Sequence, residues 1–279
     1  MSVYKSFAVV GGGKLGLPIL NALAAKGVSV ILLSRPGSTT KTVPSGVPVV
    51  EVDSSDAAAV AAVFKEHKID VALATLGAAA SAAQKPLVDA AKLAGVKLFV
   101  PSEYGFATDG SAETGSILAN KDEIAVQLKS VGIPSTRIYT GMFAESIPWI
   151  VDYSEGSKIK IVGKGDTPVS VTSIPDIAGF VAHVLTTAPP SELEDRILRL
   201  EGDRTTLSGL AALFNTSIEH VDGFGDARTL LQNVMATGAG STGWDGLKKA
   251  EGTGSNAAGS ANALWPGHQW QSIKEIYKL

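Results

Sequence analysis

Short apolar segments without polar alternation recur through the first half of the chain, and longer Ala- and Leu-rich segments separate them. We expect strands over residues 6–10, 29–33, 47–52, 71–74, 97–100 and 135–139. Helical patterns lie between most of these strands, over residues 15–26, 57–67, 80–94 and 116–131. Apolar strands that alternate with helices are typical of a parallel sheet covered on both faces. The pattern therefore predicts an α/β fold with a doubly wound parallel sheet.

Two segments depart from this regular alternation. Residues 36–48 are rich in Pro, Gly, Ser and Thr, so we expect a loop without a helix between the second and third strands. Gly, Ser and Ala dominate residues 237–261, which favours either a long, partly mobile lid or a solvated low-complexity insert.

The second half of the chain has shorter predicted elements. We expect strands at 158–162, 169–172 and 196–200, a helix at 175–185 and an amphipathic segment at 207–214. We therefore predict a dinucleotide-binding domain over residues 1–153 and a smaller C-terminal α/β substrate domain over residues 154–279. Parts of residues 166–188 are candidates for packing back on the first domain.

Composition excludes several classes of function. The 24 Lys and Arg residues nearly balance the 27 Asp and Glu residues, for a formal net charge of −3, whereas nucleic acids and anionic membranes require a basic face. The chain has no Cys, and its four His residues are far apart, so we expect no metal site. No segment approaches the roughly 18 apolar residues of a membrane span. We expect a cytoplasmic protein.

A glycine-rich loop joins the first predicted strand to the first predicted helix. Residues 11–16 read Gly-Gly-Gly-Lys-Leu-Gly and supply the G-x-G-x-x-G pattern in that position. Gly11 permits a tight turn, Gly13 lets the backbone approach a pyrophosphate, and Gly16 permits close packing of helix on strand. The helix N-terminus offers N–H groups to the phosphates. The loop therefore predicts a Rossmann-type dinucleotide site that includes Gly11, Gly13, Lys14, Leu15 and Gly16.

The residues after the second strand indicate which dinucleotide binds. An NAD site usually carries Asp or Glu there, for the ribose 2′-hydroxyl. This chain has Ser34 and Arg35, with Lys41 further along the loop. A guanidinium pairs with a 2′-phosphate through charge-assisted hydrogen bonds, so we predict NADP(H) as the cofactor. An exposed, solvated Arg35 is the alternative.

The ends of the third and fourth strands supply further candidates. Asp53 either reaches the adenine or caps the helix that follows it. Thr75, Leu76 and Gly77 follow the fourth strand. If the strand order reverses between the first and fourth strands, these residues face the glycine loop across the crevice.

Lys121 stands on the apolar stripe of its predicted helix. Ile117, Ile124, Leu128 and Val131 form the stripe, and Lys121 takes the position that is missing from it. Burial lowers the pKa of a lysine, which then serves as a general base or proton donor. A side chain that snorkels to solvent is the alternative. No Tyr lies four residues before a Lys, so the Tyr–Lys chemistry of ordinary short-chain dehydrogenases is not supported.

Several motifs together resemble the NmrA-like / isoflavone reductase-like family, an atypical branch of the short-chain dehydrogenase superfamily. They are Gly11–Gly16, Ser34–Pro36, Gln84, Asp89–Lys97, Phe99–Gly105, Asn120–Lys121, Gly132–Pro134, Met142–Ala144, Gly163–Asp166 and Pro175–Ala178. The similarity covers roughly residues 5–185. Its most specific part is Pro-Ser-Glu-Tyr-Gly at 101–105, where Tyr104 replaces the usual Phe of the family.

The resemblance implies NADPH-dependent reduction of a small, usually aromatic metabolite. Lys121 then lies near the nicotinamide ribose and takes part in proton transfer. The resemblance adds Gln84, Pro101, Ser102, Glu103 and Tyr104 to the cofactor site. It assigns the substrate pocket to Tyr104, Met142, Phe143 and Ile147, with Trp149 as a further candidate wall and a plain core role as the alternative.

Three functions stay open at this point. The first is an NADPH-dependent oxidoreductase with a small-molecule substrate. The second is a non-catalytic NADP(H)- or NAD(P)-sensing regulator with a protein partner, as some relatives are. The third, and least supported, is a lyase or isomerase that uses the nucleotide only structurally. The sequence leaves open whether the chain is a monomer or a homodimer.

Overall fold

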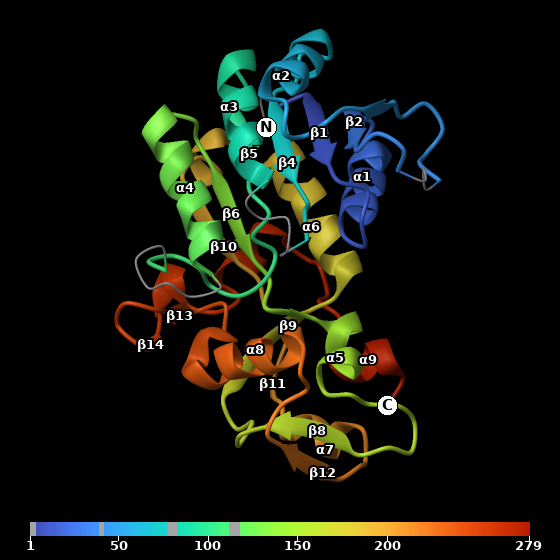
Figure 1. The fold of residues 1–279 in the computed structure, drawn as a ribbon, viewed down its shortest axis with the longest axis vertical. Helices are drawn as coiled ribbons and strands as arrows, with labels where there is room; N and C mark the ends of the chain where they lie inside the picture. The colour runs from blue at the N-terminus through green and yellow to red at the C-terminus, as the bar shows by residue number, and fades with distance from the viewer. Residues whose placement is uncertain (1–3, 39–41, 78–82, 112–117) are drawn as a thin grey trace. The chain divides into compact units, whose positions relative to one another are not determined.

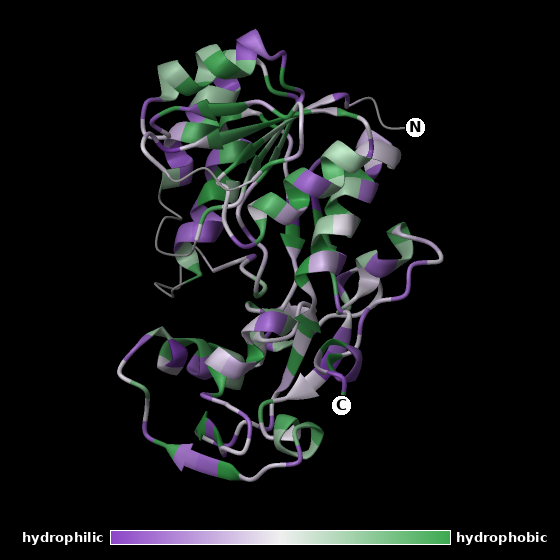
Figure 2. Ribbon diagram, turned by 90° about the vertical axis from the view of Figure 1, so that its right-hand side faces the viewer, coloured by the Kyte–Doolittle hydropathy of each residue, from purple (hydrophilic) through white to green (hydrophobic). Residues whose placement is uncertain are grey.

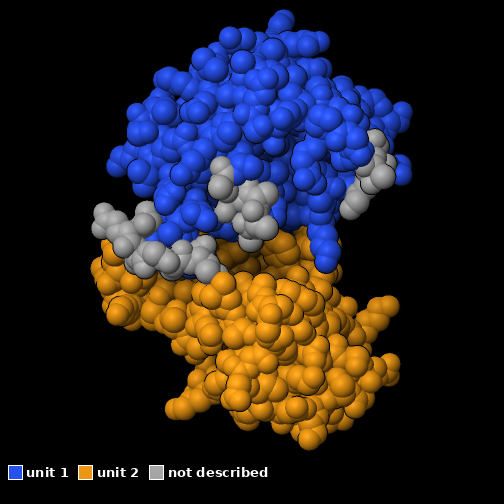
Figure 3. Space-filling view, viewed as in Figure 1, with its two compact units in different colours: residues 1–103, 111–138, 177–197 blue, residues 104–110, 139–176, 198–279 orange. Residues whose placement is uncertain are grey.

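The computed structural model describes residues 4–38, 42–77, 83–111 and 118–279, and it divides the chain into two compact units (Figure 3). Unit 1 consists of residues 1–103, 111–138 and 177–197, and unit 2 consists of residues 104–110, 139–176 and 198–279. Each unit is discontinuous in sequence. The predicted domains, residues 1–153 and 154–279, are each continuous in sequence and are not the same division as these units. That domain boundary stays a prediction.

A five-stranded parallel sheet forms the centre of unit 1 (Figure 1). Its strands are β1 (Ser6–Val10), β2 (Ser29–Ser34), β3 (Val49–Glu51), β4 (Val71–Ala74) and β5 (Leu98–Val100). The spatial order is β3-β2-β1-β4-β5, and all four pairings are parallel. The order therefore reverses between β1 and β4, which confirms the predicted doubly wound sheet.

Helices cover both faces of this sheet (Figure 2). They are α1 (Gly16–Ala25), α2 (Ala57–Glu66), α3 (Gln84–Ala94), α4 (Ala119–Val131) and α6 (Ile174–Thr187), whose first three residues belong to unit 2. One face contributes Ala8, Val10 and Ile31 to a core shared with Phe64 of α2 and Leu128 of α4. Successive side chains of a strand point to opposite faces of the sheet. The other residues of β1 are also buried, so they pack against the helices on the second face.

Two further strands accompany this sheet. β6 (Thr136–Tyr139) follows a parallel bridge between Phe99 and Ser135, so it enters beside β5. β6 pairs in turn with β10 (Arg196–Arg199). Within residues 35–38 and 42–48, the connection between β2 and β3 contains no helix, as predicted.

Unit 2 is built from short elements. Its strands are β7 (Met142–Phe143), β8 (Ile159–Val162), β9 (Pro168–Thr172), β11 (Asp203–Thr206), β12 (Ile218–Val221), β13 (Trp244–Asp245) and β14 (Ala250–Glu251). Its helices are α5 (Ile147–Ile150), α7 (Gly209–Leu213), α8 (Ala227–Val234) and α9 (Ile273–Tyr277). β9 lies between β11 and β7, and β8 pairs with β12. The predicted elements at 158–162, 169–172 and 207–214 therefore lie within a residue or two of observed ones.

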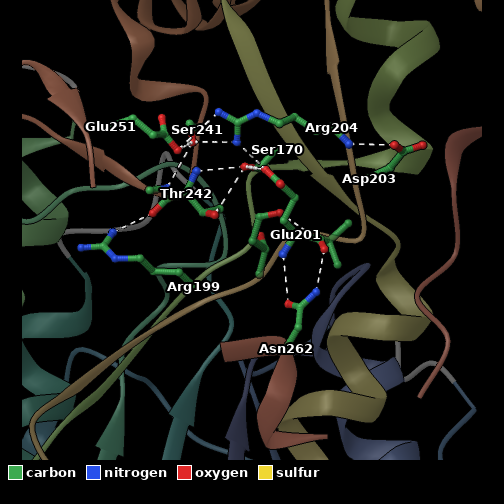
Figure 4. Close-up of polar contacts among 12 residues, drawn as sticks. Ser170, Arg199, Glu201, Asp203, Arg204, Ser241, Thr242, Glu251 and Asn262 are labelled. Atoms are coloured by element: carbon green, nitrogen blue, oxygen red, sulfur yellow. Dashed lines mark hydrogen bonds and ion pairs between the residues drawn. The ribbon is translucent and has the colours of Figure 1, made fainter. Parts of the chain in front are cut away.

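The Gly-, Ser- and Ala-rich segment is packed over residues 238–243, whereas residues 246–251 and 253–256 are exposed (Figure 4). Ser241 and Thr242 are buried, and the Thr242 backbone N–H donates to Ser170 Oγ at 3.0 Å. Arg199 Nη1 donates to the Thr242 carbonyl oxygen at 2.7 Å. Gly238, at a φ of +103°, lies so close to the Trp244 ring that a Cβ would be 2.4 Å from a ring carbon. The interpretation as a solvated low-complexity insert is therefore wrong for residues 238–243, and it stays open for the exposed middle of the segment.

Candidate functional site

A cavity of about 460 Å³ opens at the carboxyl end of the parallel sheet, within unit 1. Its lining comes from the ends of β1, β2 and β4 and from both sides of β3: Val10, Gly11, Gly12, Gly13, Leu17, Leu32, Leu33, Ser34, Arg35, Ser38, Val49, Val52, Ser54, Thr75, Leu76, Gly77 and Ala83. It therefore lies at the point where the strand order reverses, which is where open α/β sheets bind ligands.

The three glycines of the motif have different surroundings. Gly11 has a φ of +106°, which side chains rarely adopt. A Cβ on Gly16 would lie 1.9 Å from the Gly11 carbonyl oxygen and 2.5 Å from Thr75 Oγ1, whereas a Cβ on Gly13 would meet no protein atom within 4 Å. Gly16 thus serves close packing, and Gly13 leaves open space at the cavity.

The start of α1 completes this loop. Leu15 is the N-cap residue and makes no side-chain cap, and the Leu17 N–H donates to the Gly13 carbonyl oxygen at 3.3 Å. Lys14 is exposed in the same loop. A glycine loop and a helix start beside the cavity fit the pyrophosphate of a dinucleotide.

Arg35 and Ser34 line the part of the cavity that follows β2, as predicted. Arg35 is exposed, and no carboxylate among the described residues forms an ion pair with it. Its guanidinium is therefore available for an anionic ligand. Lys41 lies outside the described residues.

Asp53 does not cap the following helix. Its carboxylate accepts hydrogen bonds from the backbone N–H and the hydroxyl of Ser55, and these bonds lower its pKa. The N-cap of α2 is Asp56, which accepts from the N–H groups of Ala58 and Ala59. Of the two alternatives for Asp53, the helix cap is wrong. Its neighbours Val52 and Ser54 line the cavity, so adenine contact stays a prediction.

Hydrogen bonds join the loops after β4 and β5. Ser102 Oγ donates to the Leu76 carbonyl oxygen at 2.7 Å, and the Ser102 N–H donates to Gln84 Oε1 at 2.7 Å. Thr75 Oγ1 donates to the Gly11 carbonyl oxygen at 2.8 Å. Gln84 and Ser102 are buried, so they hold the loops of the site in register, a role that the sequence did not reveal.

Lys121 lies at the beginning of α4, and its Nζ donates to the Glu103 carbonyl oxygen. Burial lowers the pKa of Lys121; the Glu103 carboxylate opposes this effect, and the Arg137 guanidinium adds to it. Lys121 is partly buried, and its amine ends at a backbone carbonyl oxygen of the protein, which favours the inward orientation over snorkelling to solvent. The turn at Pro101–Glu103 lies directly against it.

Sequence reasoning missed two charged residues beside Lys121. Arg137 Nε donates to Glu103 Oε1 at 2.8 Å, and Arg137 Nη1 lies 2.9 Å from Asp122 Oδ1. Glu103 is 1% exposed, so its carboxylate faces Arg137 in the interior. The signal that could have revealed these partners is an arginine within an apolar, buried strand. A buried guanidinium requires a charged partner nearby.

Tyr104, the first residue of unit 2, has an unusual backbone. Its φ is +25°, a region that bulky side chains seldom adopt. Its side chain is buried, and its hydroxyl has no hydrogen-bond partner among the described residues. Burial raises the pKa of the hydroxyl. Its contact with cofactor or substrate stays a prediction.

The other predicted pocket residues belong to unit 2. Met142 and Ile147 are buried, Phe143 is partly buried, and Trp149 is half exposed. Trp149 lines a separate groove with Pro148, Tyr153 and neighbouring polar residues. Substrate contact by Met142, Phe143 and Ile147 stays a prediction.

Within residues 4–38, 42–77, 83–111 and 118–279, no group of three or more His, Asp or Glu side chains is arranged to hold a metal ion. None of the helices in these ranges is both long and apolar enough to cross a membrane.

Comparisons with known proteins agree with this geometry. The chain is 29% identical to oxidoreductase BOA1 of Botryotinia fuckeliana over 64% of its length and 65% of that protein, less than two thirds of it. It is 27% identical to phenylcoumaran benzylic ether reductase IRL1 of Ginkgo biloba, over 74% and 72% of the two chains. The structure of leucoanthocyanidin reductase from Vitis vinifera with NADPH superposes with a TM-score of 0.78, at 18% identity over 98% of both chains, which shows the same fold.

The model of one family matches most of the chain. It covers residues 4–221, a range that contains the glycine loop, Arg35, Lys121 and Arg137. The protein belongs to the NmrA-like family.

Proposed function

We propose that the protein is an NADPH-dependent oxidoreductase that reduces a small aromatic or secondary-metabolite substrate. The observation that carries the proposal is the cavity of unit 1, in which a glycine cradle and an available Arg35 lie at the switch point of the sheet. The relative in Botryotinia is named an oxidoreductase and the one in Ginkgo a reductase, which supports the same chemistry.

The residues of the cavity fit the parts of NADPH in order. Gly13 and the residues that follow it at the start of α1 would hold the pyrophosphate through backbone N–H groups, and the open space at Gly13 would admit it. The Gly11 N–H donates to the Leu33 carbonyl oxygen, so Gly11 serves the turn itself. Arg35 and Ser34 hold the 2′-phosphate. Leu76, which lines the cavity and bonds to Ser102, would contact the nicotinamide end. NADPH supplies the hydride when it is bound.

Lys121 holds the proton that the reaction requires. Its lowered pKa brings the exchange of a proton at Nζ closer to neutral pH, which is the condition for efficient acid–base catalysis. A lysine drawn into the interior also costs stability, which a protein that only senses the nucleotide has no need to bear. We therefore prefer the enzyme over the sensing regulator.

Turnover tests this proposal directly. We expect NADPH oxidation with at least one member of a panel of aromatic ketones, enones and benzylic ethers. Lys121→Ala should lower kcat at least about 100-fold, the usual contribution of a general acid or base. Lys129→Ala, an exposed lysine of the same helix, is the matched control and should retain wild-type kcat. Tight NADPH binding without turnover, unchanged by Lys121→Ala, would support the sensing regulator instead.

Cofactor preference tests the role of Arg35. Arg35→Ala should raise the KM for NADPH about ten-fold or more and leave the KM for NADH nearly unchanged, because the charge-assisted bonds to the 2′-phosphate are lost. Arg196→Ala removes another exposed arginine of unit 1 that does not line the cavity, and should change neither value. Equal effects of Arg35→Ala on both cofactors would refute NADP(H) preference.

A further inference from the structure

Four charged residues meet around the turn after β5. Two are acidic, Glu103 and Asp122, and two are basic, Lys121 and Arg137. The side chains of Arg137, Glu103 and Asp122 are 10%, 1% and 9% exposed. Buried charges of this kind require close partners, and removal of one partner leaves the other uncompensated.

Arg137 joins the two carboxylates of this group. Its Nε donates to Glu103 Oε1 at 2.8 Å, and its Nη1 lies 2.9 Å from Asp122 Oδ1. Glu103 lies in the turn three residues after β5. Asp122 is in the first turn of α4, and Arg137 is in the middle of β6. One planar guanidinium therefore fixes the turn after β5 to the start of α4, a geometry that an ammonium group does not reproduce.

Glu103 meets both cations, through different groups. Its carboxylate accepts from Arg137, and its backbone carbonyl oxygen accepts from Lys121 Nζ. Asp122 directly follows Lys121 on α4. The place of the lysine amine thus depends on a turn and a helix end that Arg137 holds together.

We propose that Arg137 is a positioning residue for Lys121, because its bridge between Glu103 and Asp122 fixes the carbonyl group and the helix turn that determine where the lysine amine lies. This inference rests on the proposed role of Lys121 in proton transfer. Arg137 itself acts through Glu103 and Asp122.

The charges around Lys121 determine what removal of Arg137 does. The Glu103 carboxylate faces it from the turn after β5 and the Arg137 guanidinium from β6, and Asp122 is the next residue of α4. α3 also packs on α4, but its Lys85 is paired with Glu123. Removal of Arg137 takes away a nearby cation and leaves the Glu103 carboxylate without this partner. Both changes stabilise the ammonium form of Lys121, so its pKa rises.

NMR titration of the lysine side chains tests this inference without cofactor or substrate. The Lys121 signal in ¹³C- and ¹⁵N-lysine-labelled protein is assigned by its loss in Lys121→Arg. We expect Arg137→Met to raise its titration midpoint by about one pH unit or more. Arg137→Lys, which keeps the charge but cannot bridge both carboxylates, should give a smaller rise. Arg196→Met is the matched control and should leave the midpoint at the wild-type value.

An unchanged midpoint in folded Arg137→Met overturns the inference. If Arg137→Met does not fold, which a thermal melt shows, Arg137→Lys decides: a raised midpoint supports the inference, and an unchanged one overturns it. With an active substrate, the same variants should lower kcat about ten-fold and change the KM for NADPH less than about two-fold. A shifted midpoint in a protein that turns over no substrate would leave the positioning role intact and refute only the proposed enzyme function.

Discussion

At the scale of single residues, two glycines of the loop between β1 and α1 have different roles. Gly16 is required for packing of the fold, and Gly13 is required for ligand binding under the proposed function. We expect Gly16→Ala to lower the free energy of unfolding by about 2–3 kcal/mol or more, because its methyl group would overlap the Gly11 carbonyl oxygen and Thr75 Oγ1. Gly13→Ala should change that free energy by less than about 1 kcal/mol. It should nevertheless weaken NADPH binding at least about ten-fold, because the methyl group occupies the approach of the pyrophosphate.

Denaturant unfolding and NADPH fluorescence titration measure the two effects, and each variant is the control for the other. Wild-type NADPH affinity in Gly13→Ala would mean that the phosphates do not lie on this loop. Normal stability in Gly16→Ala would mean that α1 can shift away from β1 at little cost.

Lys121 and Arg137 show which residues of the site can be predicted from the sequence and which cannot. Lys121 could be predicted because it interrupts a helical stripe, which is a local pattern with a period of 3.6 residues. Arg137 has no comparable local signal for its partners, since Glu103 is 34 positions away along the chain. Gln84 and Ser102 were assigned to the cofactor by resemblance, but their hydrogen bonds within the protein depend on two loops that meet only after folding.

At the scale of elements, Asp152 connects α5 to β8 and α8. Its carboxylate pairs with Lys160 Nζ at 2.7 Å and with Arg228 Nη1 at 2.8 Å, and these hydrogen bonds hold its pKa below the usual value. The pair interactions therefore stabilise the fold above the unfolded-state pKa of about 4. They are lost as the pH falls through the lower pKa of the folded state.

We expect Asp152→Asn to lower the free energy of unfolding modestly at neutral pH, because water screens these partly exposed groups. The difference from wild type should shrink as the pH falls below about 4. Urea unfolding at a series of pH values measures it, with Glu155→Gln as the control, an exposed carboxylate without an ion-pair partner among the described residues. A difference that persists undiminished in acid would contradict the assigned ion pairs.

Most strands and helices of the sheet were predicted within a few residues, because burial on both faces leaves apolar runs that are visible in sequence. The turn before α2 shows the limit. Asp53 and Asp56 are both acceptable helix caps by residue type, yet Asp56 caps the helix and Asp53 bonds to Ser55. The choice depends on backbone conformation, which residue type alone does not determine.

At the scale of the whole molecule, hydrogen bonds connect the C-terminal part of unit 2 to strands that come earlier in the chain. Asn262 binds the backbone of Glu201 twice: its Nδ2 donates to the carbonyl oxygen at 2.7 Å, and its Oδ1 accepts from the N–H at 3.2 Å. The Glu201 carboxylate accepts from Ser170 and Arg204 (Figure 4). These contacts join Asn262, through Glu201, to Ser170 of β9 and Arg204 of β11.

We expect Asn262→Ala to cost about 1–3 kcal/mol, the combined worth of two hydrogen bonds, and to accelerate amide hydrogen exchange across residues 237–262. Exchange in the sheet of unit 1 should stay at its wild-type rate. Asn256→Ala, at an exposed position of the same segment, is the control. Fast exchange of the segment already in the wild type would instead support the mobile lid that its composition suggests.

Composition misled at this scale for a physical reason. Small residues are typical of loops, but they also permit close approach, as at Gly238 against Trp244 and at Gly243, where a Cβ would lie 2.5 Å from the Ala258 backbone nitrogen. The partners that hold the segment, Ser170 and Arg199 among them, come from strands earlier in the chain. No window of sequence contains both sides of such a contact.

The helix-free connection after β2 has a consequence for how this protein can evolve or be engineered. Arg35 and Ser38, which line the cavity, lie on this connection, and the Gly37 N–H donates to the carboxylate of Glu51, the last residue of β3. Since no helix packs on the sheet in its described residues, substitutions and changes of length there disturb little of the core. Under the proposed function, exchange of one nicotinamide coenzyme for the other is therefore open to a few mutations in this single connection.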